Sequence, residues 1–148
     1  MADPFVKPEE LSAAEAIAAI GDELAIFDDW MERYQFIIEL GRKLPPFPEL
    51  WANDSHRVAG CQSRVWMEAE LRDGVLLFAG KSDAAIVSGL VALLLRVYSG
   101  RTPAEIAATD PVFLKDLGLL EALSTNRGNG VAAMARKVRE VAALQRAG

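Results

Sequence analysis

The chain contains a single cysteine, Cys61, and its neighbours are of types that could support thiol chemistry. Cys61 follows Gly60 and precedes polar residues, rather than lying in an apolar run. Nearby cations favour the reactive thiolate, and Arg57 and Arg64 are close in the sequence. A free cysteine can also be a small buried core residue. Local composition leaves both interpretations open.

The numbers of cysteines and histidines exclude several functions. One cysteine cannot form an intrachain disulfide, and one cysteine with one histidine cannot build an ordinary zinc site. The sole histidine, His56, is a candidate base for a cysteine hydrolase. No other residue completes a triad with it, so a surface histidine at a strand end is the favoured interpretation.

A polar, glycine-rich segment, STNRGNG at residues 124–130, is a second candidate site. Backbone amides in such segments can hold anions, but this one matches neither the dinucleotide nor the P-loop pattern. We interpret it as a connecting loop. A further interpretation is that the loop holds Arg127 so that its positive charge reaches a site elsewhere, such as Cys61.

The elements that must position Cys61 are two or three strands. Residues 63–71 alternate between two faces, Asp73-Gly74 is a strong hairpin signal, and residues 75–79 form the return strand. Residues 56–58 could form a third, short strand before Gly60. Cys61 would then lie in a tight connection between strands. Trp66, on the face opposite Val65, would be covered by a helix or left exposed for a partner.

Helices are predicted on both sides of this sheet. Capping residues, periodic apolar positions and terminal glycines predict helices from Ser12 to Gly21, 23–40 ended by Gly41, 84–99 capped by Ser82 or Asp83 and ended by Gly100, from Pro103 after Thr102, from Asp110, and 131–145. The helix at 84–99 is apolar around most of its circumference and should be buried. The order of elements predicts an α+β domain, with an antiparallel sheet of about three strands packed against several helices.

Composition indicates one domain over residues 1–148, with a loose N-terminal arm at 1–10. The chain is 51% hydrophobic and has a net charge of −5. An acidic chain has no general attraction for phosphate backbones, so we expect no nucleic-acid partner. No apolar run is long enough to span a bilayer, and the N-terminus has no signal-peptide pattern, so we expect no membrane association and a cytoplasmic location.

Four segments of the chain resemble the SufE family of sulfur acceptors, to which the CsdE proteins are related. The segments are WMERYQFIIELGRKLPP at 30–46, RVAGCQSRVW at 57–66, GKSDAAIVSGLVALLLRVYSGRTPAEI at 80–106 and FLKDLGLLEALSTNRGNGVAAM at 113–134. The GCQS-x-VW element is specific, and the other elements follow in the family's order. The chain differs at Lys81, where many relatives have an acidic or polar residue.

The resemblance implies an α+β fold shared with IscU-type scaffolds and no bound cofactor or metal. It implies that Cys61 accepts persulfide sulfur from a PLP-dependent cysteine desulfurase of the SufS or CsdA type. The protein would stimulate that enzyme and pass sulfur to an iron–sulfur scaffold or another downstream acceptor. Arg127 and Asp83 match family residues, and Gln62, Ser63 and His56 are further candidates for supporting the thiol or contacting a partner.

Two other functions stay open from the sequence. A one-cysteine thiol peroxidase would also use a reactive thiol beside an arginine. A regulatory module would dock on a desulfurase and change its activity without carrying sulfur. The single cysteine itself favours a relay, because a second nearby thiol could attack the persulfide and release sulfide. The protein would then be a carrier and an activator rather than a stand-alone enzyme.

Overall fold

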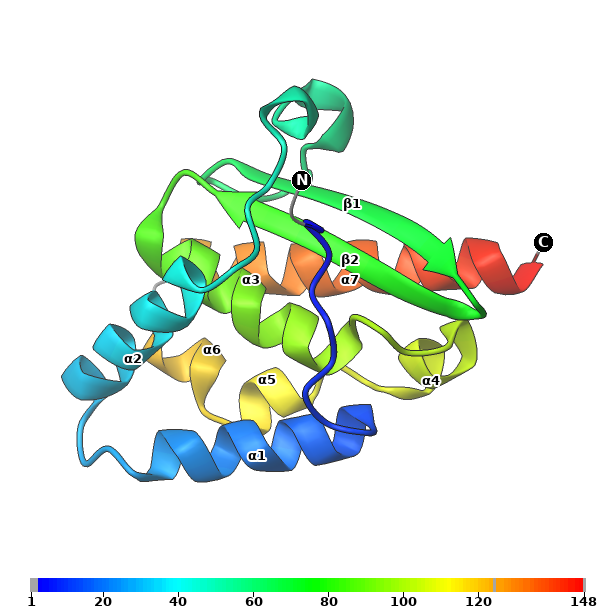
Figure 1. The fold of residues 1–148 in the computed structure, drawn as a ribbon. Coiled ribbons are helices and arrows are strands. Elements are labelled where there is room, and N and C mark those ends of the chain that lie inside the picture. Colours follow the sequence, from blue (N-terminus) through cyan, green and yellow to red (C-terminus); the bar gives the residue numbers. More distant parts are fainter. Residues whose placement is uncertain (1–2, 124, 148) are drawn as a thin grey trace.

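The computed structural model describes residues 3–123 and 125–147, with the side chains of all of these except positions 121, 122, 125–127, 146 and 147. It combines helices with one antiparallel hairpin, so the predicted α+β class is confirmed (Figure 1). The elements in order are α1 (Ala13–Ala25), α2 (Trp30–Arg42), the 3-10 helices η1 (Glu49–Trp51) and η2 (Asp54–His56), β1 (Val65–Arg72), β2 (Val75–Ser82), α3 (Ala85–Tyr98), α4 (Pro103–Ala108), α5 (Phe113–Asp116), α6 (Leu119–Ala122) and α7 (Thr125–Ala147).

The sheet consists of the two strands β1 and β2 in the described part of the chain. Val65 pairs with Ser82 at the open end, and the turn has positive φ at both Asp73 (53°) and Gly74 (84°), as a tight hairpin requires. The predicted third strand at 56–58 is wrong. The Asn53 side chain accepts hydrogen bonds from the backbone of residues 55 and 56 and so caps η2, and only Arg57 pairs with β1, through a single bridge.

The first two helices differ from their predicted boundaries. Ser12 caps α1 as predicted, but the helix continues through Gly21, and Asp29 caps α2. Gly41 lies inside α2 and does not end it. A Cβ atom at Gly41 would lie 2.5 Å from the backbone nitrogen of Gly89 in α3, so the glycine serves the close crossing of two helices.

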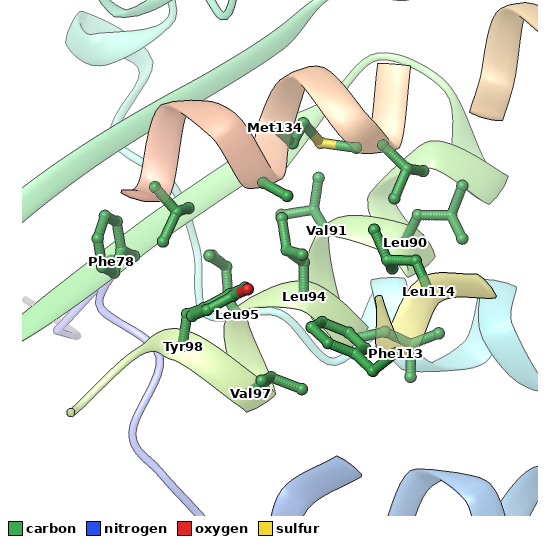
Figure 2. Packing of buried hydrophobic residues seen from close by; sticks show 14 of the residues in the cluster. Phe78, Leu90, Val91, Leu94, Leu95, Val97, Tyr98, Phe113, Leu114 and Met134 are labelled. Atoms are coloured by element: carbon green, nitrogen blue, oxygen red, sulfur yellow. The ribbon is translucent and has the colours of Figure 1, made fainter. Parts of the chain in front are cut away.

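The main core lies between the inner face of the sheet and the helices, with α3 at its centre. Val65, Met67 and Phe78 of the sheet belong to this cluster, together with side chains of α3 and α7. Figure 2 shows Leu94 and Tyr98 of α3, both fully buried, among Phe113 and Met134. The prediction of a buried helix here is therefore confirmed. Replacing such a leucine by alanine costs about 2–5 kcal/mol.

A second cluster covers the outer face of the sheet. Its members come from β1, β2 and two irregular segments, and they are Phe5, Phe47, Trp66, Leu77 and Ala79, with Trp51 and Ala52 packed at the edge. Trp66 is therefore buried within this cluster, which includes Phe5, Phe47 and, at its edge, Trp51 of the 3-10 helix η1. Residues 3–10, part of the arm predicted at 1–10, cross β2 and continue toward α1 (Figure 1). We call these residues the N-terminal strap.

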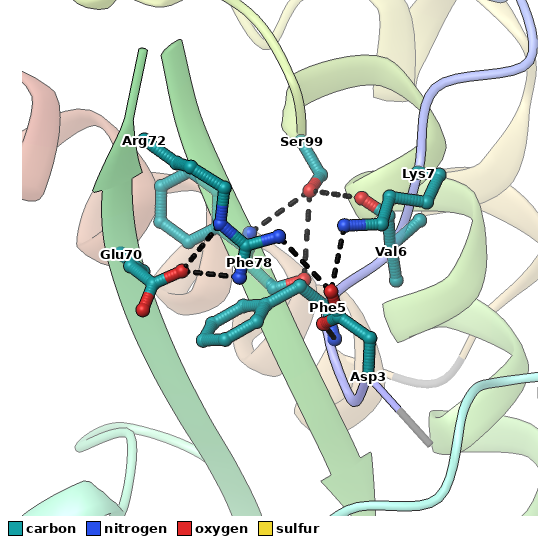
Figure 3. A network of polar contacts seen from close by, with 8 residues as sticks. All are labelled: Asp3, Phe5, Val6, Lys7, Glu70, Arg72, Phe78 and Ser99. Carbon is teal, nitrogen blue, oxygen red and sulfur yellow. Dashed lines mark hydrogen bonds and ion pairs between the residues drawn. The ribbon is translucent and has the colours of Figure 1, made fainter. Parts of the chain in front are cut away.

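Polar groups at the end of α3 bind the strap to the sheet. The backbone N–H of Val6 donates to the carbonyl of Phe78 (2.8 Å), and the hydroxyl of Ser99 donates to the carbonyl of Val6 (2.6 Å), as Figure 3 shows. The Arg101 side chain, which is 3% exposed, donates to the carbonyl of Glu10 (2.7 Å). None of the helices in the described ranges is long and apolar enough to cross a membrane.

Candidate functional site

Cys61 lies in an irregular segment, residues 59–64, that joins the bridge residue Arg57 to strand β1; we call it the Cys61 loop. Its base is closed by a hydrogen bond from the Val58 N–H to the Val65 carbonyl (2.8 Å). At its other end, the Arg64 carbonyl accepts from the Ser82 hydroxyl (2.7 Å) and from the Asp83 N–H (3.2 Å). The loop is thus fixed at both ends by the sheet and by the β2–α3 junction.

Asp83 holds the loop rather than capping α3. Its Oδ1 accepts from the Arg64 N–H at 3.1 Å, which completes a reciprocal pair with the bond described above. The capping prediction is wrong for Asp83, because Ala84 is the N-cap residue and no side chain caps the helix there. Ser82 comes nearest to the predicted role, since its hydroxyl accepts from the Ala84 N–H at 3.2 Å. The Ser82–Asp83 pair therefore positions the C-terminal end of the Cys61 loop.

The Cys61 side chain is partly buried against helix α7. Its Sγ donates a long hydrogen bond to the Gly130 carbonyl (3.5 Å) and packs against the main core. Gly60 adopts a left-handed conformation (φ +88°), and a Cβ atom there would lie 3.2 Å from the Cβ of Ala133. A glycine at position 60 therefore lets the loop approach α7 closely and brings the thiol under partial cover.

Burial and charge act in opposite directions on the thiol. Burial raises the pKa of Cys61 above its ordinary value, and the positive charges of Arg57 and Arg136 offset part of that rise. The net effect is a raised pKa, which favours the protonated thiol over the thiolate. The sequence identified Arg57 as a nearby cation but missed Arg136.

Arg136 lies within the helix predicted at 131–145, and the sequence does not show that this helix packs against Cys61. Residues 125–130 of the segment 124–130 form the first turns of α7, so the loop prediction is wrong for them; residue 124 lies outside the described residues. Extending the helix back would have placed Gly130, Ala133 and Arg136 at three-residue spacing along one side of it. The backbone of Arg127 lies one turn before Gly130, and its side chain is outside the described part.

His56 belongs to a polar cluster with groups other than the thiol. Its Nε2 lies 2.8 Å from Glu68 Oε2, its Nδ1 lies 3.0 Å from Asn53 Oδ1, and its ring stacks on Trp51. Both ring nitrogens therefore have partners, which fits the surface interpretation better than that of a base for Cys61.

The remaining predicted residues, Gln62 and Ser63, lie in the loop beside Cys61. The Gln62 side chain is exposed, and that of Ser63 is half-buried. Among the described residues, no group of three or more histidine, cysteine, aspartate or glutamate side chains is arranged to hold a metal ion.

Comparisons with known proteins agree with this architecture. The family model "SufE: Fe-S metabolism associated domain" matches residues 18–142. The chain is 40% identical over 126 residues to an uncharacterized SufE-like protein of Rhizobium meliloti (strain 1021), covering 82% of this chain and 90% of the relative. It is also 40% identical over 147 residues to one of Rhizobium etli, covering 95% and 98%.

The fold is also similar to a solved structure. The solution structure of a hypothetical protein from Thermus thermophilus superimposes with a TM-score of 0.74, at 20% identity, over 90% of this chain and 97% of that one. The chain belongs to the SufE family, as its resemblance in sequence predicted. That membership supports a sulfur-related role in iron–sulfur metabolism.

Proposed function

We propose that Cys61 accepts persulfide sulfur from a PLP-dependent cysteine desulfurase and passes it on toward iron–sulfur cluster assembly. The observation that carries this proposal is the position of the chain's only thiol. It lies in a loop that is fixed at both ends and only lightly held in between. Such a thiol can be sheltered at rest and still reach a partner when the loop moves.

The transfer is a thiol exchange without net oxidation. The Cys61 thiolate attacks the outer sulfur of the persulfide on the desulfurase cysteine. A new S–S bond forms on Cys61 while the S–S bond on the enzyme breaks, and the enzyme's thiolate leaves. The electron pair of the broken bond stays on the leaving sulfur, and the proton of the Cys61 thiol goes to solvent or to a base of the partner. One cysteine is sufficient, because the product is a persulfide and not a disulfide.

The resting site protects the thiol rather than activating it. Partial burial limits access to Cys61, and the raised pKa favours the protonated thiol, so both limit its oxidation in free solution. Attack on a donor sulfur needs both exposure and the thiolate. We therefore expect a closed major state and an open minor state, with the desulfurase favouring the open one.

The protected thiol also separates this proposal from its alternatives. A peroxidase needs a thiolate at rest, whereas burial here favours the protonated thiol. A purely regulatory module would not need its only cysteine in a loop between two fixed ends. Both alternatives therefore have less structural support than the carrier.

The Cys61→Ser variant tests the proposal through the turnover of the cognate desulfurase. Wild-type protein should stimulate the enzyme by removing its persulfide sulfur, whereas Cys61→Ser should bind but lose the stimulation. Asp22→Asn is the control, since it changes one exposed side chain on α1, outside the Cys61 loop, and keeps the thiol. Equal stimulation by Cys61→Ser and wild-type protein would mean that the protein regulates without carrying sulfur.

A further inference from the structure

The N-terminal third of the chain has a net negative charge, and the rest has a net positive charge. Residues 1–54 contain 12 acidic and 4 basic side chains, whereas residues 55–148 contain 9 acidic and 12 basic ones. The net charge of −5 therefore conceals a basic region. Because Debye screening leaves only charges within about 10 Å effective, a local cluster matters more to a docking partner than the total.

Three basic side chains near the Cys61 loop lack the ion pairs that several basic side chains elsewhere in the described structure form. Lys7, Arg72 and Arg96 form ion pairs with acidic residues of the strap, of β1 or of α1. In contrast, the described ion pairs include none made by the basic side chains Arg57, Arg136 and Lys137, and all three are exposed.

These three cations line one groove between the Cys61 loop and α7. The hollow has a volume of about 390 Å³, with residues 57–60 on one side and Ala133, Arg136, Lys137 and Glu140 of α7 on the other. A second hollow of about 330 Å³ shares Arg57 and Lys137 and continues over Met67, Phe78 and Val141. The combined groove has three basic residues next to the Cys61 loop and apolar residues farther along. Two carboxylates also line it, Glu140 and Glu68, and Glu68 is paired with His56.

We propose that this groove binds an acidic segment of the cysteine desulfurase, and that the segment separates the Cys61 loop from α7. This inference rests on the proposed function and names the surface through which the sulfur donor docks. Carboxylates of the segment would pair with Arg136 and Lys137, and an apolar residue would occupy the far hollow.

The position of the groove explains why its occupant should be the donor. One wall is the loop backbone at residues 58–60, and the other is the helix that covers the thiol. An occupant between these walls replaces contacts such as that of Gly60 with Ala133, and it exposes Cys61. Exposure also removes the burial that raises the thiol pKa. The first step, acceptance of sulfur, needs this change, because the donor must reach the partly buried Sγ and burial disfavours the thiolate.

The test is a reversal of charge on the groove, measured as binding. Arg136→Glu and Lys137→Glu are combined in a Cys61→Ser background, so that altered ionisation of the thiol cannot contribute. The matched control combines Lys43→Glu and Lys115→Glu, which change the net charge equally at exposed positions that do not line the groove. Isothermal titration with the desulfurase gives Kd for both at low and at high salt.

We expect the groove variant to bind about tenfold or more weakly than its parent at low salt, with a smaller difference at high salt. The control should stay within about twofold. Equal binding by the groove and control variants, with both folded by circular dichroism, would overturn the inference. As a second measurement, the parent's own Kd should rise with salt, and an affinity independent of salt would also overturn it.

A failure of the inference can be told from a failure of the proposed function. Wild-type protein incubated with the desulfurase and cysteine should gain sulfur whether or not the groove is the docking site. If it gains sulfur while the charge reversal leaves Kd unchanged, only the groove inference is wrong. If it gains none, the proposed function itself is wrong.

Discussion

Two irregular segments pack against the same hairpin, and they are held in different ways. The N-terminal strap is bound by side chains that are themselves buried or ion-paired. Ser99 and Arg101 donate to its carbonyls, and Arg96 pairs with Glu10 (2.7 Å). The Cys61 loop is secured at its two ends. Among the described side chains, its middle makes one long hydrogen bond, from Cys61 to Gly130 (3.5 Å).

The two segments differ in the hydrogen bonds that would be lost if each were displaced. Displacing the strap would remove the Val6 carbonyl that Ser99 donates to and the Glu10 carbonyl that Arg101 donates to. A buried donor that loses its acceptor costs about 1–3 kcal/mol. Within the described part of the chain, displacing the middle of the Cys61 loop gives up one long sulfur hydrogen bond and the packing of Cys61 against the core. We conclude that the strap is a fixed part of the fold, whereas the loop is suited to opening.

Removing the side chain of Arg101, which holds the strap, should give the largest effect on stability. Arg101→Ala removes donors to the carbonyls of Val97, Arg96 and Glu10 at a site only 3% exposed. We expect the free energy of unfolding to fall by about 3 kcal/mol, measured by urea denaturation. Arg57→Ala is the control at an exposed arginine beside the Cys61 loop, with a change under about 0.5 kcal/mol. A loss below about 1 kcal/mol for Arg101→Ala would contradict the conclusion that the strap is a fixed part of the fold.

A substitution that strains the closed Cys61 loop should increase the reactivity of Cys61, because it favours the open loop. Gly60→Ala places a side chain at φ +88° and against Ala133, which costs about 1–2 kcal/mol in the closed state. If opening relieves that strain, the open population rises about tenfold. Alkylation of Cys61 by a bulky maleimide should accelerate by a similar factor.

Gly74→Ala is the matched control for this experiment. Gly74 has a similar φ of +84°, but a Cβ atom there would meet nothing within 4 Å, and the residue lies in the hairpin turn. It should lose similar stability without changing the alkylation rate. Equal acceleration by both variants would mean that alkylation reports general destabilisation and not opening of the loop.

The pH dependence of alkylation gives the smallest expected effect. Burial raises the pKa of Cys61, so the rate should reach its midpoint at a higher pH than that of a free peptide thiol. Arg57→Ala removes a charge that lowers this pKa, so it should move the midpoint higher still. Arg64→Ala is the control, because Arg64 is not a cause of the shift. A midpoint below that of the free peptide would contradict the account of a sheltered thiol.

The same shift also links stability to pH. Because the folded pKa lies above the unfolded one, the protonated thiol stabilises the fold below the unfolded pKa, and this contribution is lost as pH rises through the folded pKa.

Local signals in the sequence predicted the elements whose causes are local. Asp73-Gly74 specified the hairpin turn, and Thr102 with Pro103 specified the start of α4, because each depends on residues within one turn. The apolar circumference of α3 likewise predicted its burial. The family resemblance identified Cys61 as the acceptor, and this role stays a prediction for the experiments described here.

Contacts between distant segments account for the errors. Gly41 has the residue type of a helix end, yet its position is set by the backbone of Gly89. The start of α7 is rich in glycine and polar residues, which disfavour a helix locally, so tertiary packing must override propensity there. Cys61 meets Gly130 across a separation of 69 residues, and no local pattern could have predicted its partial burial.

The most direct test of the central claim is the mass of the protein after incubation with a cysteine desulfurase and cysteine. We predict a gain of one sulfur atom that dithiothreitol removes. Trypsin should release the peptide VAGCQSR, residues 58–64, which contains Cys61, and the added sulfur should lie on that peptide. The Cys61→Ser variant should gain nothing. Wild-type protein that gains no sulfur, or a Cys61→Ser variant that still gains it, would contradict the proposal that Cys61 carries sulfur.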